Sequence, residues 1–63
     1  MLSKEDYKKY LDQMAEIEMN MIKIYSECAS LAEEEELKKI FLNLVDDEGR
    51  HFHLVTSLKK LFL

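Results

Sequence analysis

The sequence contains no proline, no tryptophan, one glycine and one cysteine. With so few helix-breaking residues, long helices can run with little interruption. One cysteine excludes a disulfide scaffold and a metal site built from four thiolates. No apolar run approaches the roughly 18 residues that a membrane span needs, and no signal-peptide pattern is present. We therefore expect a protein of the reducing cytoplasm that makes no membrane contact.

The charge balance is acidic, with 13 Asp and Glu against 9 Lys and Arg, a net charge of −4. Affinity for nucleic acid comes mainly from clustered Lys and Arg, so no nucleic-acid partner is expected. A hydrophobic content of 48% excludes intrinsic disorder. The sequence also shows no Ser/His/Asp nucleophile pattern, phosphate loop or dinucleotide fingerprint.

The chain is short, 63 residues, which is one small domain at most. Ordering a chain costs about 1.5 kcal/mol per residue, and a lone pair of helices offers only one seam of contact to offset that cost. We therefore expect the core to be completed against other copies, as a homodimer or a larger homo-oligomer.

Helix-favouring residues dominate, and apolar positions recur in steps of three and four. A first helix is predicted from about 3 to 32, because Ser3 and Asp6 form a capping-box pattern ahead of its stripe. A second helix is predicted from about 36 to 62. The break near 33–35 is inferred from phase alone, since the six-residue gap from Leu31 to Leu37 interrupts the spacing. The first stripe is Tyr7, Tyr10, Met14, Ile17, Met21, Ile24, Cys28, Leu31; the second is Leu37, Phe41, Leu44, Glu48, His51, Val55, Leu58, Phe62. The expected fold is an all-α antiparallel hairpin over 1–63.

Two ionisable residues occupy the middle of the second stripe. Glu48 and His51 are three residues apart, so they share one helix face, and that face is the apolar one. A bare carboxylate there costs several kcal/mol unless it is paired. Protonation or a hydrogen bond, an ion pair, or a metal ion would each relieve that cost.

Glu18 of the first helix lies level with this pair. The midpoint of 18 and 48 is 33, and that of 18 and 51 is 34.5, so both coincide with the expected turn. With equal rise on both arms, Glu18, Glu48 and His51 lie at one height. Two hairpins related by a twofold axis would supply four Glu and two His. Ferritin-like di-iron bundles use this ligand set, and its hard oxygens with imidazole suit Fe, with Mn or Zn as alternatives.

The stretch from Glu18 to Tyr25, the run Glu36-Leu-Lys-Lys-Ile-Phe41 and the motif Asp47-Glu-Gly-Arg-His51 resemble the rubrerythrin group of the ferritin-like superfamily. A two-helix chain that dimerises to build its site is similar to the encapsulated ferritins, which oxidise Fe(II) inside an encapsulin shell. The resemblance covers roughly residues 10 to 60. It implies a four-helix bundle with two Fe per dimer, ligated by Glu18, Glu48 and His51, and Tyr25 packing near them or hydrogen-bonding a ligand.

The resemblance implies an oxidoreductase, either a ferroxidase or a rubrerythrin-like peroxidase, and the sequence does not separate the two. One cysteine cannot make the four-cysteine iron centre of rubrerythrins proper, so peroxidase turnover would need an external reductant. Encapsulin cargo usually carries a C-terminal targeting peptide, and this sequence ends about where the helix does, which leaves the encapsulin partner open.

Two readings without redox chemistry remain. In the first, the chain is a structural or adaptor bundle in which Glu48 and His51 hydrogen-bond across the dimer and fix its register. In the second, zinc staples the assembly. Replacing both residues by Leu would preserve or raise the stability of the metal-free bundle, whereas a metal protein would lose its ion.

Overall fold

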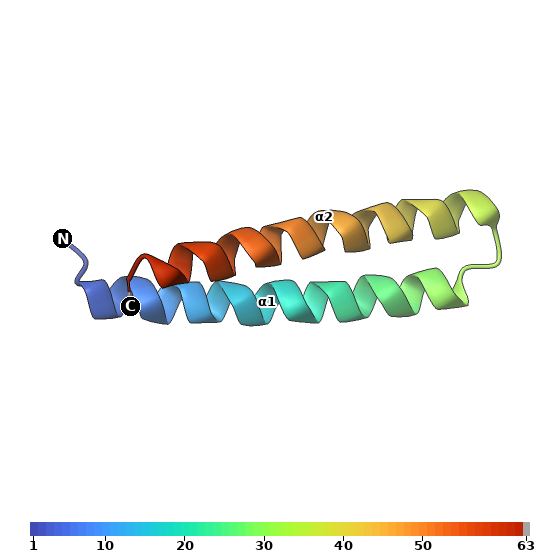
Figure 1. The fold of residues 1–63 in the computed structure, drawn as a ribbon. Helices are drawn as coiled ribbons and strands as arrows, with labels where there is room; N and C mark the ends of the chain where they lie inside the picture. Colours follow the sequence, from blue (N-terminus) through green and yellow to red (C-terminus); the bar gives the residue numbers. More distant parts are fainter. Residues whose placement is uncertain (63) are drawn as a thin grey trace.

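The computed structural model describes residues 1–62 and consists of two helices, α1 (Lys4–Leu31) and α2 (Glu35–Lys60). They lie side by side and antiparallel, joined at one end by a short loop, with the two chain ends together at the other (Figure 1). The hairpin measures 47 × 17 × 14 Å. The prediction of an all-α antiparallel hairpin is therefore confirmed, and its pairing into a bundle stays a prediction.

Local chemistry explains where the helices begin and end. Ser3 is an extended N-cap whose hydroxyl accepts from the Asp6 N–H at 3.1 Å, while the Asp6 carboxylate accepts from the Ser3 N–H at 3.0 Å. α2 ends two residues before the expected position 62. The N–H groups of Leu61 and Phe62 donate to carbonyls only three residues back, at 3.0 Å each, so the chain tightens into a turn there. Leu63 lies outside the described residues.

The seam between the helices lies one row away from the stripe that the sequence favoured on α1. Leu11 and Ala29 of α1 and Val55 of α2 are buried, and Tyr25 is half-buried between them. Ile17, in the middle of the predicted stripe, is 59% exposed. The apolar surface of α1 is thus wide enough for two rows, and α2 covers the row that contains Leu11.

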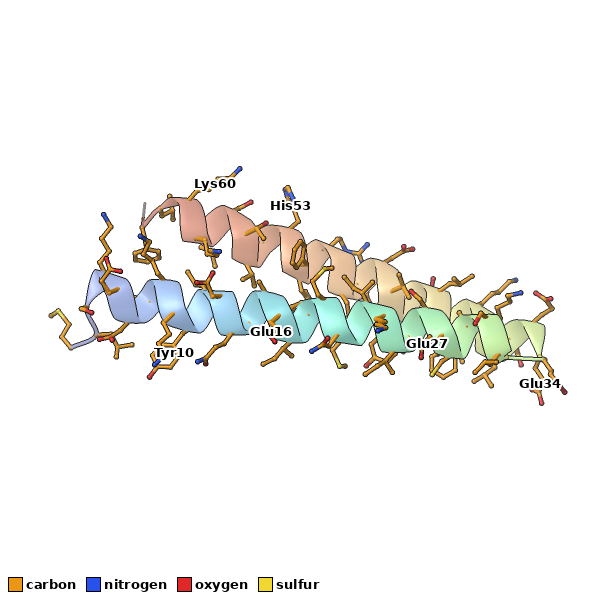
Figure 2. All side chains as sticks on the ribbon, turned by 90° about the horizontal axis from the view of Figure 1, so that it is seen from below. Tyr10, Glu16, Glu27, Glu34, His53 and Lys60 are labelled. Atoms are coloured by element: carbon orange, nitrogen blue, oxygen red, sulfur yellow. The ribbon has the colours of Figure 1, made fainter. Side chains whose placement is uncertain are left out.

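The uncovered rows of both helices lie on the same side of the hairpin, which we call the outer face. Tyr10, Ile17 and Leu54 each precede a seam residue by one position. Each side chain is therefore rotated by 100° from the seam about the axis of its helix, in the same sense relative to the chain direction. Because the helices run in opposite directions and face one another, that rotation sends both rows to one side. Its members are 37 to 79% exposed: Tyr10, Met14, Ile17, Ile24, Leu31, Leu37, Ile40, Leu54, Leu58, Leu61. Figure 2 shows Tyr10 pointing to this side and His53 to the opposite one.

Two contacts link the helices at the open end of the hairpin. The rings of Tyr7 and Phe62 stack with centroids 5.3 Å apart. Lys59 forms an ion pair with Asp12. Within residues 1–62, neither helix combines the length and apolar character that crossing a membrane would require.

Candidate metal centre

The hairpin brings the three predicted ligands together. Glu18 projects from α1, and Glu48 and His51 project from α2. Nδ1 of His51 lies 3.6 Å from Oε2 of Glu48 and 3.8 Å from Oε2 of Glu18. One donor atom from each residue can be chosen so that all three lie within 4.8 Å of one another.

The register of the hairpin produces this convergence. The loop between the helices consists of residues 32–34 and is centred on 33, which is the midpoint of Glu18 and Glu48. Since both helices rise 1.5 Å per residue, residues equally far from the loop lie level. Both glutamates also lie in the covered seam row, seven residues after Leu11 and seven before Val55, so their side chains meet.

The burial of the three side chains is unequal. Glu18 and Glu48 are 19% and 15% exposed, whereas His51 is 57% exposed. Oε2 of Glu18 is shielded from solvent and has no hydrogen-bond partner among residues 1–62. Leaving such an oxygen unpaired costs about 1–3 kcal/mol, more if the group is charged. Neither distance from His51 is short enough for a hydrogen bond, so this oxygen acceptor lies in the middle of the seam without one.

The donor set and its spacing fit a metal ion. Carboxylate oxygen and imidazole nitrogen suit Fe, Mn and Zn. Metal bonds to such atoms are about 2.0–2.2 Å, so ligands on opposite sides of one ion stand about 4.2 Å apart. The three donor atoms lie within 4.8 Å of one another, so a small movement of their side chains would bring them around one ion. The shielded oxygen of Glu18 would gain in the ion the partner that it lacks.

His51 stands at the boundary between the seam and the outer face. It lies on the α2 row that runs through Ile40 and Leu54, whose side chains are 54% and 58% exposed. The three donors on one hairpin leave half the positions of a six-coordinate ion unfilled. His51, the most exposed of the three donors, thus lies toward the uncovered apolar side of the hairpin.

Tyr25 is half-buried in the seam, seven residues beyond Glu18, or about 10 Å along α1. Its ring packs on Phe41, with centroids 6.4 Å apart. A hydrogen bond from Tyr25 to a ligand stays a prediction. The sequence did not single out the ion pair of Arg50 with Asp47, which flanks the cluster on α2, although its three-residue spacing is the usual signal for such a pair.

Comparison of the chain with protein-family models, curated proteins and solved structures found no match.

Proposed function

We propose that two copies of the hairpin pair through their outer faces to form a four-helix bundle of the ferritin-like type. The support is the outer face itself, on which each helix carries a row of half-exposed large apolar side chains, such as Ile17 and Leu54. Complete burial of one such side chain stabilises the folded protein by about 1.5–3 kcal/mol. A face left in water therefore lacks a large part of this stabilisation. The facing pair would also bring two copies of the cluster close together.

In that bundle two Glu18, two Glu48 and two His51 would hold a pair of iron ions, with Mn and Zn as competitors for the site. The observation that carries this proposal is the convergence of the three donors around a shielded, unpartnered Glu18 oxygen. Iron supplies one-electron redox chemistry when it is bound. The carboxylates would favour the more highly charged ferric state, because each added positive charge strengthens their attraction in a half-buried site.

The proposed reaction is oxidation of Fe(II) by O₂ or peroxide. Two Fe(II) give up one electron each. With two protons, these electrons reduce one O₂ to hydrogen peroxide, or one hydrogen peroxide to two waters. Glu18 and Glu48 bind and orient the two substrate ions, and exposed His51 lies where the two hairpins would meet. The outer faces, once joined, exclude bulk water from the ions.

The test is anaerobic loading with Fe(II) followed by addition of O₂ or peroxide, with ferric product measured for wild type and Glu48→Ala. Glu16→Ala is the matched control, because Glu16 is an exposed carboxylate on α1 that the cluster does not use. We expect rapid oxidation by the wild type and the control and a rate near that of free Fe(II) for Glu48→Ala. Equal rates for all three would reject the proposal and favour the metal-free structural bundle.

A further inference from the structure

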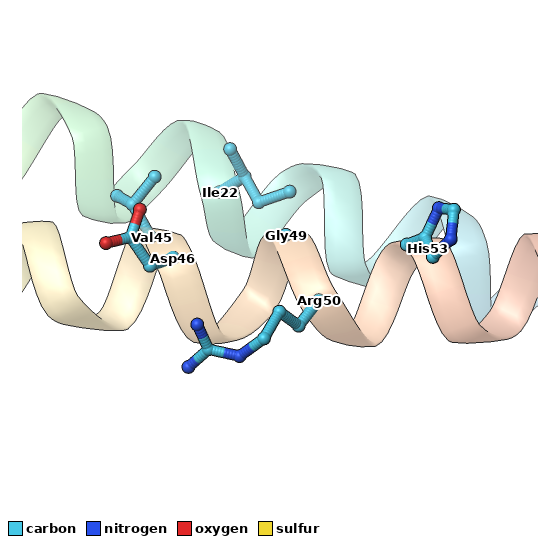
Figure 3. Close-up of a pocket in the computed structure, with 6 residues that line it drawn as sticks. All are labelled: Ile22, Val45, Asp46, Gly49, Arg50 and His53. Carbon is cyan, nitrogen blue, oxygen red and sulfur yellow. The ribbon is translucent and has the colours of Figure 1, made fainter.

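A second surface lies on the side of the hairpin opposite the outer face. It is a shallow open groove with Ile22 of α1 and Val45 of α2 on its apolar floor (Figure 3). Asp46, Arg50 and His53 of α2 line the rest of it, around the bare backbone of Gly49. Beyond these lining residues, Met19 and Leu42 are 52% and 48% exposed. None of these side chains takes part in the Glu18–Glu48–His51 cluster.

Gly49 has no role inside the hairpin that the structure reveals. It lies in mid-helix, its φ is not positive, and a Cβ built on it would meet nothing within 4 Å. Glycine at such a position costs about 1 kcal/mol relative to alanine. A residue that the hairpin itself does not need, and that leaves the helix backbone bare, allows close approach by a chain from outside.

While Lys38 and Lys39 lie earlier in α2, the charged residues nearest this glycine change sign across it. Asp46, Asp47 and Glu48 precede it, whereas Arg50, Lys59 and Lys60 follow it with no acidic residue between Arg50 and position 62. On the groove side the row runs Leu42, Asp46, Gly49, His53, Thr56, in alternating steps of four and three. Within residues 1–62, Asp46 forms no ion pair, while Arg50 pairs with Asp47. Such a row is complementary to itself when two copies run antiparallel.

We propose that a second copy of the chain docks in this groove, with the two α2 helices crossing antiparallel at Gly49. A twofold axis at Gly49 places Asp46, three residues before it, close to the other copy's His53, four residues after it. The same crossing brings Asp46 within reach of the other copy's Arg50, whose side chain is long and exposed. Gly49 faces Gly49, which lets the helices come close.

This contact neither uses metal nor depends on pairing through the outer face. A chain with two self-complementary faces on opposite sides assembles beyond the dimer. If both contacts form, the wild type contains at least four chains. If the groove contact alone forms, the wild type is a dimer. In either case, blocking the groove should reduce the mass at least twofold.

The test is sedimentation equilibrium of the wild type, Gly49→Leu and Ser57→Leu over a range of concentrations, with chelator, at pH 8. A Cβ at position 49 meets nothing within 4 Å in the single hairpin, and leucine favours helix more than glycine does, so circular dichroism should show unchanged or higher helicity. We expect Gly49→Leu to have half the wild-type mass or less. Ser57→Leu is the matched control, since it adds the same side chain at an exposed α2 position outside the groove, and it should match the wild type.

Charge reversal provides a second criterion. Asp46→Arg and Arg50→Asp should each lower the mass, because like charges would then meet across the crossing. The double variant D46R/R50D should recover the wild-type mass. Equal masses for wild type and Gly49→Leu would overturn the proposal. They would mean that the groove receives a different partner or none. Failure of the double variant to recover would overturn the antiparallel arrangement. A monomeric Gly49→Leu beside a dimeric wild type would reject pairing through the outer face and leave the groove contact standing.

Discussion

Replacing Glu18 by leucine should change the stability of the protein in opposite directions with and without metal. In the metal-free chain the glutamate places an unpaired, shielded oxygen in the seam, with only 19% of its side chain exposed. An oxygen of this kind costs about 1–3 kcal/mol, and the residual exposure places the value at the lower end. Glu18→Leu should therefore raise the free energy of unfolding by about 1 kcal/mol. For a domain of this size that is a rise of about 4–8 °C in Tm.

Bound metal should make the wild type more stable than Glu18→Leu, which reverses the order expected without metal. An ion that binds only the folded protein stabilises it by about 2.7 kcal/mol when its concentration is 100 times Kd. Wild type has all three donors within 4.8 Å and should gain this amount, whereas the leucine variant lacks one of them and should gain far less. The wild type should then be more stable than Glu18→Leu by between 1 and 2 kcal/mol, about the difference between the two effects.

The assay is urea unfolding followed by circular dichroism, first with chelator and then with anaerobic Fe(II), at one fixed chain concentration. Fixing the concentration matters because the stability of an oligomer depends on it. Glu16→Leu serves as the control, since Glu16 is exposed and should show the same gain from Fe(II) as the wild type. The reasoning is refuted if Glu18→Leu destabilises the metal-free protein, or if Fe(II) stabilises wild type and Glu18→Leu equally.

Three further outcomes are expected. Ile17→Glu should abolish pairing through the outer face, as measured by sedimentation, because a carboxylate buried there is costly; helicity preserved together with unchanged mass would show that the face is not an interface. Hydrogen bonds from the Ser3 backbone N–H, and then from its hydroxyl, lower the pKa of Asp6. The stabilisation that follows from this lowered pKa is complete above the ordinary Asp pKa of about 3.9. It is lost as pH falls through the lower pKa that Asp6 has in the folded chain, so NMR should show the first turn of α1 persisting below pH 3.9. Asp12→Ala should cost less than about 1 kcal/mol in urea unfolding, because the side chain of Asp12 is 59% exposed and that of its partner Lys59 is 36% exposed; a larger loss would mean that this pair holds the open end of the hairpin.

The hairpin and the level of the candidate site could be predicted from the sequence because both depend on regular helical geometry. Steps of three and four fix the helices, and the six-residue gap after Leu31 marks the break. Once the loop is centred on 33, equal rise along both arms places Glu18 beside Glu48 without any knowledge of side-chain packing.

The choice of seam row could not be predicted, because α1 carries two adjacent apolar rows. One contains Leu11 and the other Ile17, and periodicity favours the row of Ile17, whose apolar side chains are larger and uninterrupted. Which row meets α2 depends on the fit between two helices, a property of three-dimensional packing that a single stripe does not contain. The same limit applies to Glu18, which lies next to Ile17 of the predicted stripe and which the structure places within the seam. The unpaired state of its oxygen likewise follows only from the packed side chains.

Metal content per chain tests the central claim most directly. The protein would be loaded anaerobically with Fe(II), separated by size, and its iron and chain concentrations measured in each fraction beside Glu48→Ala. We expect about one iron per chain in the paired species of the wild type and almost none in the variant. A well-folded, paired wild type that retains no iron would contradict the central claim, and the three converging side chains would then be a polar contact within a structural bundle.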